Sequence, residues 1–500
     1  MLEIAVEFSS FLIFLFVGLI SPRLLLYAYI WVAPFLGGNL IAGFYVPYPP
    51  GRSIAFALVA STMLRGRFWN RLGKYGTSLV SVLLCIVALT AVGGLFAWSN
   101  REELLLSVWN QPPLTKALRA LLAEAVFWLA PACAIGVLTT PESSRFALRQ
   151  VAHSAVFYVS LGLLQFLIAN FFGYDLFPVV RVAAFGQVVG VQNVGLTRIT
   201  SICGEPRYFG VFCALWFALV LVAGGHLGFP RSRRAAVAGM FLLGAVLTGS
   251  RSALVLIAVV LVASLLGAGA TGASHLALRR LPLLSGAIVL FAFALTSDRF
   301  VLSSRLVVSD RAEGDYIELA GVRIPMEYQD KAAVSALQAK PFAHLIGFGP
   351  GLWQYYANPF ENSSLRATYF SNGVASLDSM RQNSAILSRY VSFGLVGLAF
   401  MAAACRRLYE LIRVHARSAG ARRRLKAAFF VFMTLTCATN FADVYYLLTL
   451  ILACSVVCYP EQAQTSASRA QREMSRQTPR HDFRVPRPIP PLTLPSDARV

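Results

Sequence analysis

The chain has 500 residues, of which 57% are hydrophobic and 13% charged, and its mean hydropathy is +0.63. Ordinary soluble domains carry about 25% charged residues, so this composition excludes a water-facing surface over most of the chain. The formal net charge of +21 does not indicate nucleic acid binding, because the basic residues are concentrated in short gaps between apolar segments.

Apolar segments near the length of about 20 residues that a bilayer requires recur from end to end. In chain order they cover 3–20, 24–46, 76–98, 117–138, 151–172, 212–227, 235–247, 254–268, 283–295 and 385–404. The segment 53–64 is short for a span. The segment 427–459 is too long for one crossing and has Asn440 and Asp443 near its middle, which predicts two short helices and a turn. The sequence therefore predicts an all-α, polytopic integral membrane protein with about 11–13 transmembrane helices.

The distribution of basic residues predicts the orientation of these helices. Lys and Arg are enriched in loops that stay in the cytoplasm, and the gaps at 65–74, 231–234, 279–280 and 406–426 are rich in them. With those gaps inside, the segments 99–116 and 173–207, the turn at 249–251 and the long loop at 298–384 all lie on the outer face. The nearly balanced charge of 298–380 agrees with this assignment.

Four regions follow along the chain: transmembrane helices over 1–297, a large external loop over 298–384, further helices over 385–459 and a basic cytoplasmic tail over 460–500. In the loop, 328–340 (YQDKAAVSALQAK) has helical apolar spacing and 347–351 (GFGPG) is a turn cluster. We therefore expect a folded cap whose aromatic residues form an exposed surface: Trp353, Tyr355, Tyr356, Phe360, Tyr369 and Phe370. The Pro-, Ser- and Arg-rich tail predicts disorder.

The eight cysteines have neither metal-binding nor disulfide spacing. All but Cys203, which falls in an external segment, lie in or at the edges of apolar segments, and we predict that all of them pack in the core. The sequence also lacks a P-loop and the HExxH and GxSxG motifs.

Arg251 is the first candidate functional residue. It lies in LTGSRSALVLIAVV, at a Gly-Ser break between two apolar helices, where an ionisable residue at membrane depth is costly and indicates a function. A guanidinium group stays charged and binds phosphate oxygens through two N–H groups. The alternative is an interfacial anchor, since an arginine at a helix end snorkels to the membrane surface.

Arg198 and Arg207 flank a second candidate group in TRITSICGEPRYFGVF, together with Glu205 and Pro206. Two arginines and a carboxylate just before a span are suited to positioning a diphosphate and handling a proton. The alternative is a helix start, because the helix dipole favours Glu there and Pro is common at the first position.

A third group runs from His344 and the glycines of 347–351 to Arg381, Gln382 and Asn383. His344 is the one histidine of the large external loop. A histidine in a loop is more often exposed to solvent than catalytic, and such glycines are more often turn residues than a phosphate cradle.

Four motifs, in this order, resemble the O-antigen polymerase and O-antigen ligase superfamily. They are RITSICGEPRYFG at 198–210, SRSAL at 250–254, LIGFGPG at 345–351 and QNSAIL with GLVGL at 382–398. The arrangement is similar too: a Ser-Arg turn, two spans, a large outer loop and an Asn at the start of the next helix. The resemblance covers about 195–400, and the first half of the chain matches by hydropathy alone.

The resemblance implies a glycosyltransferase in the bacterial inner membrane with its active face in the periplasm. The donor would be an oligosaccharide linked to undecaprenyl diphosphate, used without a nucleotide, a metal or another cofactor. Arg251 would then bind the donor diphosphate from one side, and Arg198, Glu205 and Arg207 from the other. Further partners would be membrane lipids and a chain-length regulator or other polysaccharide assembly proteins.

One departure from the family pattern bears on the mechanism. Ligase-type members usually show His-Asn where this chain has Gln382 and Asn383, and Gln cannot act as a base. The departure favours a polymerase over a ligase and leaves Glu205 or His344 as the general base. Catalytic roles thus fall to Arg251, Glu205 and His344, and substrate-binding roles to Arg198, Arg207, Arg381, Gln382 and Asn383.

Two other classes remain as alternatives. A flippase or transporter of lipid-linked sugars would show internal repeats with broken helices, and the sequence has no such repeat. A structural scaffold for polysaccharide assembly would not explain arginines at the outer membrane boundary. The sugar, the linkage and the particular polysaccharide stay undetermined by the sequence.

Overall fold

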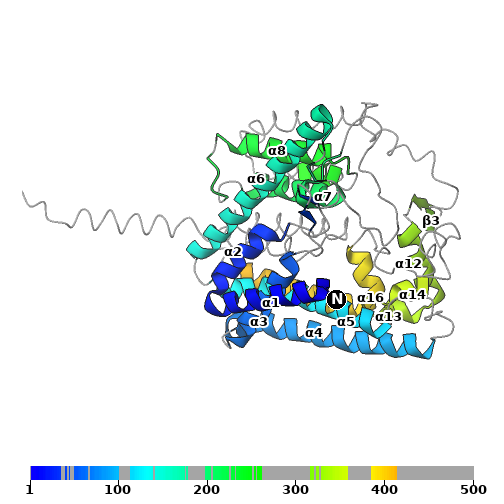
Figure 1. Ribbon diagram of the computed structural model, residues 1–500. Coiled ribbons are helices and arrows are strands. Elements are labelled where there is room, and N and C mark those ends of the chain that lie inside the picture. The colour runs from blue at the N-terminus through cyan, green and yellow to red at the C-terminus, as the bar shows by residue number, and fades with distance from the viewer. Residues whose placement is uncertain are drawn as a thin grey trace, which may run out of the picture.

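The computed structural model describes much of the helical body and part of the external loop (Figure 1). The described residues are 2–34, 40–41, 44–45, 50–65, 68–100, 113–138, 141–174, 176–177, 198–203, 206–223, 227–230, 232–250, 253–254, 256–258, 260–261, 316–319, 322–325, 328–357 and 385–413. The predicted spans at 283–295 and 427–459 and the predicted tail lie outside them.

The described chain is predominantly helical. Its helices are α1 (Leu2–Ile20), α2 (Pro22–Val32), α3 (Pro50–Leu64), α4 (Phe68–Ser99), α5 (Pro113–Val137), α6 (Pro141–Phe172), the 3₁₀ turn η2 (Ser201–Cys203), α7 (Pro206–Ala223), α8 (Arg234–Leu247), α12 (Tyr328–Ala339), α13 (Phe342–Ile346), α14 (Trp353–Ala357) and α16 (Ala385–Arg413). Helices α2, α3, α5, α6 and α7 begin at a proline, which has no N–H to leave unpaired and a φ suited to the first helical position.

Two antiparallel hairpins add to the expected all-α class. Strands β1 (Leu40–Ile41) and β2 (Phe44–Tyr45) form the first. The second lies in the external loop, where β3 (Tyr316–Leu319) pairs with β4 (Val322–Pro325) and Ile317 faces Ile324 in the register. These hairpins are short and leave the protein a helical one.

Four helices in the described part of the chain are long and apolar enough to cross a membrane: Gly76–Ser99, Pro113–Ala134, Glu142–Phe172 and Ile386–Arg407. Shorter apolar helices cover Phe8–Ile20, Ser53–Leu64, Tyr208–Leu221 and Arg234–Leu247. The prediction of membrane-spanning helices is confirmed in this coarse form. The larger helix count of the sequence analysis stays a prediction.

The predicted span at 24–46 is wrong. Helix α2 ends at Val32, and the hairpin β1–β2 follows it. Pro34 comes directly after the C-cap residue Ala33, and it has no N–H to donate to the Ile30 carbonyl oxygen, so the helical hydrogen bonds stop there. At its other end, the Ser21 hydroxyl accepts a hydrogen bond from the Leu24 N–H at 3.3 Å, so α1 and α2 are separate helices.

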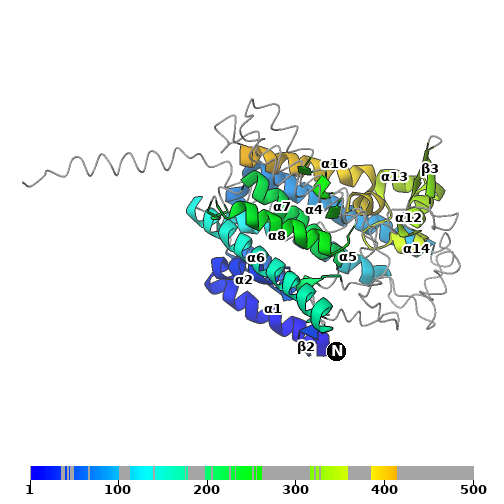
Figure 2. The same cartoon turned by 90° about the horizontal axis from the view of Figure 1, so that it is seen from above.

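Two clusters of buried residues form the core. The larger one joins α2–α8 to α16. The smaller one, which we call the cap core, joins α12–α14 to the outer ends of α4 and α5 through Ala97 and Ala117, and to α16 through Val391. The helix expected at 328–340 is confirmed as α12, and Figure 2 shows it beside α13 and α14 at one end of the helix bundle.

The cap aromatics correct one expectation. Trp353, Tyr355 and Tyr356 are at most 3% exposed, so they form the cap core and no exposed surface. Short helices such as α13 and α14 bury little apolar area by themselves, and these large rings supply it. Phe360, Tyr369 and Phe370 lie outside the described residues.

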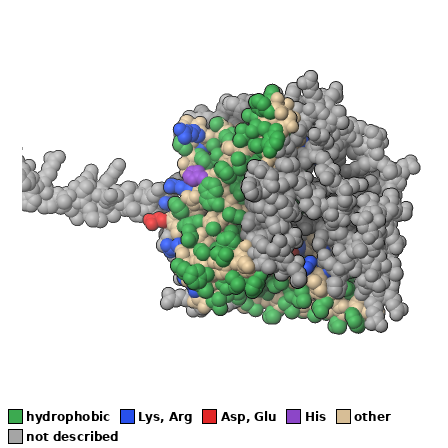
Figure 3. Space-filling model, viewed as in Figure 1, with side chains coloured by type: hydrophobic (Ala, Val, Ile, Leu, Met, Phe, Trp, Pro, Cys, Tyr) green, Lys and Arg blue, Asp and Glu red, His purple; other side chains and the backbone are tan. Residues whose placement is uncertain are grey.

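Arginine side chains gather at the end of the bundle opposite the cap (Figure 3). They come from helix ends or the turns beside them: Arg23, Arg65, Arg145, Arg149, Arg233, Arg234, Arg406, Arg407 and Arg413. Arg65 closes the last turn of α1 by donating to the carbonyl oxygens of Leu19 and Ile20, the second at 3.0 Å. A cation at a helix C-terminus is favoured by the helix dipole.

This separation of charge gives a prediction for labelling. A cysteine in place of Leu345, whose side chain is 58% exposed on α13, should react with a membrane-impermeant maleimide in intact cells. A cysteine in place of Arg233 should react only after lysis, because Lys- and Arg-rich ends stay in the cytoplasm. The unsubstituted protein is the background control, and reaction of both sites in intact cells would contradict the orientation.

Candidate functional site

Arg198 contacts the turn that follows α8. Its Nε donates to the Thr248 carbonyl oxygen at 2.7 Å, and its Nη2 donates to the Gly249 carbonyl oxygen at 3.4 Å. The backbone supports the same contact, because the Ile199 N–H donates to the Leu247 carbonyl oxygen at 3.4 Å. The structure thus brings the motif at 198–210 against the turn that precedes the motif at 250–254, about fifty residues away in the sequence. The Arg198 guanidinium is partly buried at this contact.

The turn at Thr248–Ser250 leads straight into another helical segment. The Ser250 hydroxyl accepts from the Ala253 N–H at 3.4 Å, and the Ser250 carbonyl oxygen accepts from the Leu254 N–H at 3.2 Å. Ser250 therefore has the hydrogen bonds of an N-cap for the helical residues Ala253 and Leu254. Positive helix-dipole ends attract anions, which adds to the charge of the arginines.

Helix α7 packs its first turns against this N-cap. A Cβ at Gly210 would lie 2.9 Å from the Cβ atoms of Ser250 and Ala253 and 2.7 Å from the Thr248 hydroxyl, so α7 approaches through the bare glycine. Pro206 is the first residue of α7, as predicted. In the sequence, Glu205 directly precedes this start and Arg207 follows it.

A glutamine in α6 holds the segment around Arg198 in place. The Gln165 side-chain oxygen accepts from the backbone N–H groups of Thr200 and Ser201 at 2.9 and 2.8 Å. Gln165 is fully buried, and Ser201 has a left-handed backbone with φ +49°. The Ser201 hydroxyl also donates to the Tyr158 carbonyl oxygen at 2.9 Å, so α6 binds this turn at two points.

Cys203 ends the same turn and is 3% exposed. Burial raises the pKa of its thiol above the usual value, because a buried thiolate would lose its hydration. The prediction of core packing is confirmed for Cys133, Cys203 and Cys213, while Cys85 and Cys405 are half-buried. Cys437, Cys454 and Cys458 lie outside the described residues.

The loop at 347–351 hydrogen-bonds to α16 at a break in that helix. The N–H groups of Phe348 and Gly349 donate to the carbonyl oxygens of Val391 and Ser392, both at 2.9 Å. The break lies at Gly394, where φ is 60° and ψ is −165°. A helix would use those two carbonyl oxygens for its own next turn, and the break leaves them to the loop. Gly347 and Gly394 both have positive φ and no room for a Cβ.

His344 lies on α13 beside the first turns of α16. Its Nδ1 is 2.7 Å from the hydroxyl oxygen of Tyr390, and the ring is half-buried. His344 is thus held by a defined partner, which argues against the alternative of a freely solvated loop histidine. The pair lies within the motifs at 345–351 and 382–398 that the resemblance singled out.

An ion pair that sequence reasoning missed lies near His344. An oxygen of Glu124 on α5 is 3.5 Å from Nη2 of Arg389 on α16, and the Arg389 guanidinium lies 4.3 Å from the centre of the Phe127 ring. The available signal was a single carboxylate in the apolar run ALLAEAVFWLA, since ionisable residues in spans are rare and indicate function.

The other predicted site residues have no described side chains: Glu205, Arg207, Arg251, Arg381, Gln382 and Asn383. Over the described ranges, no group of three or more His, Cys, Asp or Glu side chains is arranged to hold a metal ion.

Comparison with known protein-family models finds no match, and no curated protein matches the chain.

Gln165 is predicted to stabilise the turn that carries Arg198. Replacing Gln165 by Met should lower the free energy of unfolding by about 2–6 kcal/mol, because two buried N–H groups lose their acceptor at about 1–3 kcal/mol each. Gln165→Glu, which keeps an acceptor oxygen, should recover part of this loss. The measurement is unfolding of the purified protein in mixed detergent.

The matched control is Gln150→Met on the same helix. Gln150 accepts a hydrogen bond from Trp31 Nε1 at 3.1 Å at an exposed position, and its loss should change stability by less than about 0.5 kcal/mol. Equal stability of the two methionine variants would contradict the role assigned to Gln165.

The break at Gly394 should be intolerant of any side chain. Gly394→Ala forces a strained backbone that costs about 1–3 kcal/mol and places a Cβ against the Leu345 carbonyl group. We expect a lower melting temperature and a smaller monodisperse fraction by size-exclusion chromatography. Gly239→Ala in α8 is the control, since nothing lies within 4 Å of its Cβ; a melting temperature that falls equally in both variants would refute the prediction.

Proposed function

We propose that this protein is a membrane glycosyltransferase that polymerises undecaprenyl-diphosphate-linked oligosaccharide repeat units on the periplasmic face of the inner membrane. The product would be an O-antigen, a capsule or an exopolysaccharide. The observation that carries the proposal is the contact of Arg198 with the turn that leads into Arg251. This contact brings one guanidinium group close to the N-cap at Ser250, and both kinds of group favour phosphate binding.

Glycosyl transfer from a lipid diphosphate requires stabilisation of the leaving group's charge more than it requires a covalent intermediate with the enzyme. Arg251, with Arg198 and Arg207, would neutralise the charge that builds on the diphosphate as the anomeric C–O bond breaks. The lipid diphosphate leaves with the bonding electron pair, and a hydroxyl group of the acceptor sugar forms the new bond to the anomeric carbon. The hydroxyl proton passes to a general base, for which Glu205 and His344 are the candidates.

The arrangement of the molecule supports an outer-face reaction. The cap and His344 lie at the end of the bundle away from the arginine-rich helix ends (Figure 2). Arg381, Gln382 and Asn383 precede α16 directly, at the end of the helix where His344 meets Tyr390. These residues would bind the sugars on either side of the bond that forms.

A ligase that transfers the chain to lipid A–core is the second candidate. One observation favours it: His344 contacts Tyr390 in the first turns of α16, and ligase-type members carry their histidine just before the helix that corresponds to α16. His344 would then replace the base that Gln382 cannot supply.

Reconstitution separates these activities. Purified protein in liposomes with the host's undecaprenyl-diphosphate oligosaccharide should yield a ladder of longer lipid-linked chains without added lipid A–core. Arg251→Ala should reduce the rate by at least about 100-fold, since loss of one electrostatic donor typically costs that much, while membrane insertion stays intact. Gel analysis of radiolabelled product is the measurement.

Transfer onto lipid A–core alone would establish the ligase. Normal ladders from the Arg251→Ala protein would remove Arg251 from the mechanism, and no transfer to either acceptor would refute both activities.

A further inference from the structure

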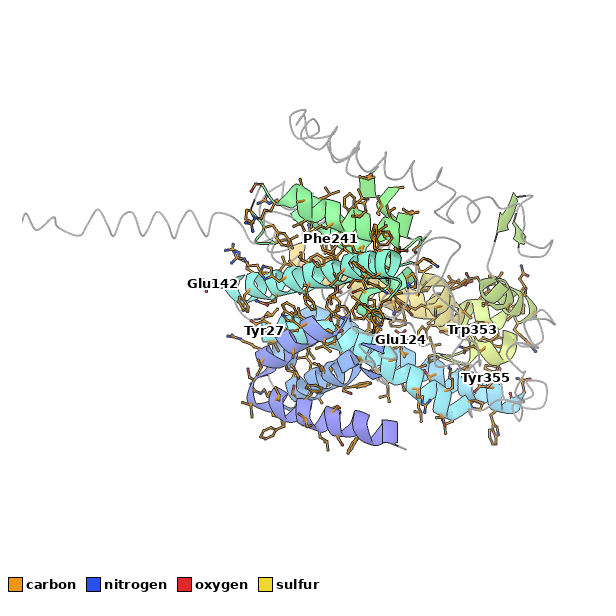
Figure 4. All side chains as sticks on the ribbon, turned by 45° about the horizontal axis from the view of Figure 1, so that its top comes forward. Tyr27, Glu124, Glu142, Phe241, Trp353 and Tyr355 are labelled. Atoms are coloured by element: carbon orange, nitrogen blue, oxygen red, sulfur yellow. The ribbon has the colours of Figure 1, made fainter. Side chains whose placement is uncertain are left out.

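The first turns of α6 carry a row of basic side chains. Arg145, Arg149 and His153 follow one another at a spacing of four residues, so they share one face of the helix. Glu142 is the single carboxylate of α6, and Figure 4 shows it at the end of the bundle opposite Trp353. This basic row therefore lies at the end of the molecule away from the cap.

The turn before α8 packs against the basic row. A Cβ at Gly228, whose φ is +82°, would lie 3.1 Å from Cγ and 3.2 Å from Nε of Arg149, so the arginine side chain rests on the bare glycine. The ring of His153 lies 6.4 Å from the ring of Phe229. From the other helix, Arg234 Nε donates to the Phe229 carbonyl oxygen at 3.1 Å. Basic side chains of α6 and α8 thus meet at one turn.

No carboxylate balances the charge at this turn within the part of the chain that the structure describes. Arg149 and Arg233 are both exposed and form no ion pair there. Arg406 and Arg407, at the same end of the bundle, instead pair with Glu410 at 3.1 and 2.7 Å. The general preference for basic residues in the cytoplasm explains why they lie at this end. It does not explain why those of two helices meet at one turn, where a bound anion would balance their charge.

The face of α6 that carries the basic row continues as an exposed apolar stripe. Further along the helix, large apolar residues recur on this face at helical spacing, and each is between 45% and 74% exposed: Phe157, Leu164, Leu167 and Phe171. A ligand along this face meets guanidinium groups at one end and apolar side chains along its length. A phospholipid has this combination of an anionic headgroup and acyl chains, whereas a soluble anion or an acidic peptide lacks the apolar part.

We propose that the basic row, together with Arg233 and Arg234, binds the headgroup of an anionic phospholipid whose acyl chain lies along the apolar stripe of α6. Guanidinium groups bind phosphate oxygens through two N–H groups, and basic pockets between transmembrane helices bind anionic headgroups. The lipid contacts α6 and the start of α8 together, so its binding stabilises the folded protein by mass action. The site lies apart from Arg198 and His344 and does not depend on the proposed function.

Lipid titration of the purified full chain in mixed detergent micelles tests the site, with bound lipid counted by native mass spectrometry. The probes are phosphatidylglycerol, zwitterionic phosphatidylethanolamine and soluble glycerol 3-phosphate. Phosphatidylglycerol should bind at least about tenfold more tightly than the other two. Arg145→Gln combined with Arg149→Gln should weaken its binding about 30-fold, since each basic residue contributes about fivefold. Arg145→Lys combined with Arg149→Lys keeps both charges and should retain most of the affinity.

Arg406→Gln combined with Arg407→Gln is the matched control. It removes the same charge from the same end of the bundle, at arginines that already pair with Glu410, and it should leave the affinity for phosphatidylglycerol unchanged. An equal loss in this control would indicate general surface attraction and would overturn the site. Wild-type affinity in the Arg145→Gln and Arg149→Gln protein, or an affinity that falls as far with lysine as with glutamine, would overturn it as well.

The remaining outcomes identify other occupants. Binding of glycerol 3-phosphate as tight as that of phosphatidylglycerol would mean a site for a soluble anion. Equal binding of phosphatidylethanolamine would mean that the headgroup charge is not recognised, and displacement of phosphatidylglycerol by poly-glutamate at equal affinity would mean a docking surface for an acidic protein segment. Each of these results would refute the lipid site. Polymer formation enters none of the measurements, so the proposed function is tested separately.

Discussion

Inside a bilayer, each backbone N–H or C=O group without a partner costs several kcal/mol, so an irregular segment persists only where the protein satisfies it. Two irregular segments of this protein illustrate the constraint. The amide oxygen of Gln165 takes up two N–H groups of the turn at 200–201. The break in α16 exposes two carbonyl oxygens, which accept from the loop at 347–351. The candidate site depends on both devices, because they fix Arg198 and His344.

The two devices use different chemistry for the same purpose. The turn at 200–201 packs against both α6 and α7, and a side-chain amide of α6 accepts from its N–H groups. The loop at 347–351 instead meets α16 backbone to backbone, which requires glycine on both sides of the contact at Gly347 and Gly394. These backbone contacts connect the cap to the long apolar helices, because α13 contacts α16 and α16 in turn packs on α4. A movement of α16 would therefore move His344 and the cap together.

Charge is arranged in two ways in this molecule. Exposed arginines gather at the helix ends opposite the cap, where water and lipid headgroups solvate them. Two arginines away from those ends are held by specific partners: Arg198 by backbone carbonyl oxygens, and Arg389 by Glu124 and the ring of Phe127. Taking such charges out of water is expensive, so a fold that keeps them must provide specific partners for them.

The sequence by itself determined the elements whose causes are local. Apolar runs predicted the four long membrane helices, Pro206 predicted the start of α7, and the periodicity of 328–340 predicted α12. The end of α2 at Val32 was missed, although the local effect of Pro34 explains it. Only the tertiary structure decided that Arg198 meets the turn before Arg251, that Trp353, Tyr355 and Tyr356 face inward, and that Glu124 meets Arg389. Those contacts join residues far apart in the chain, and side-chain neighbours at long range leave no periodic pattern in one sequence.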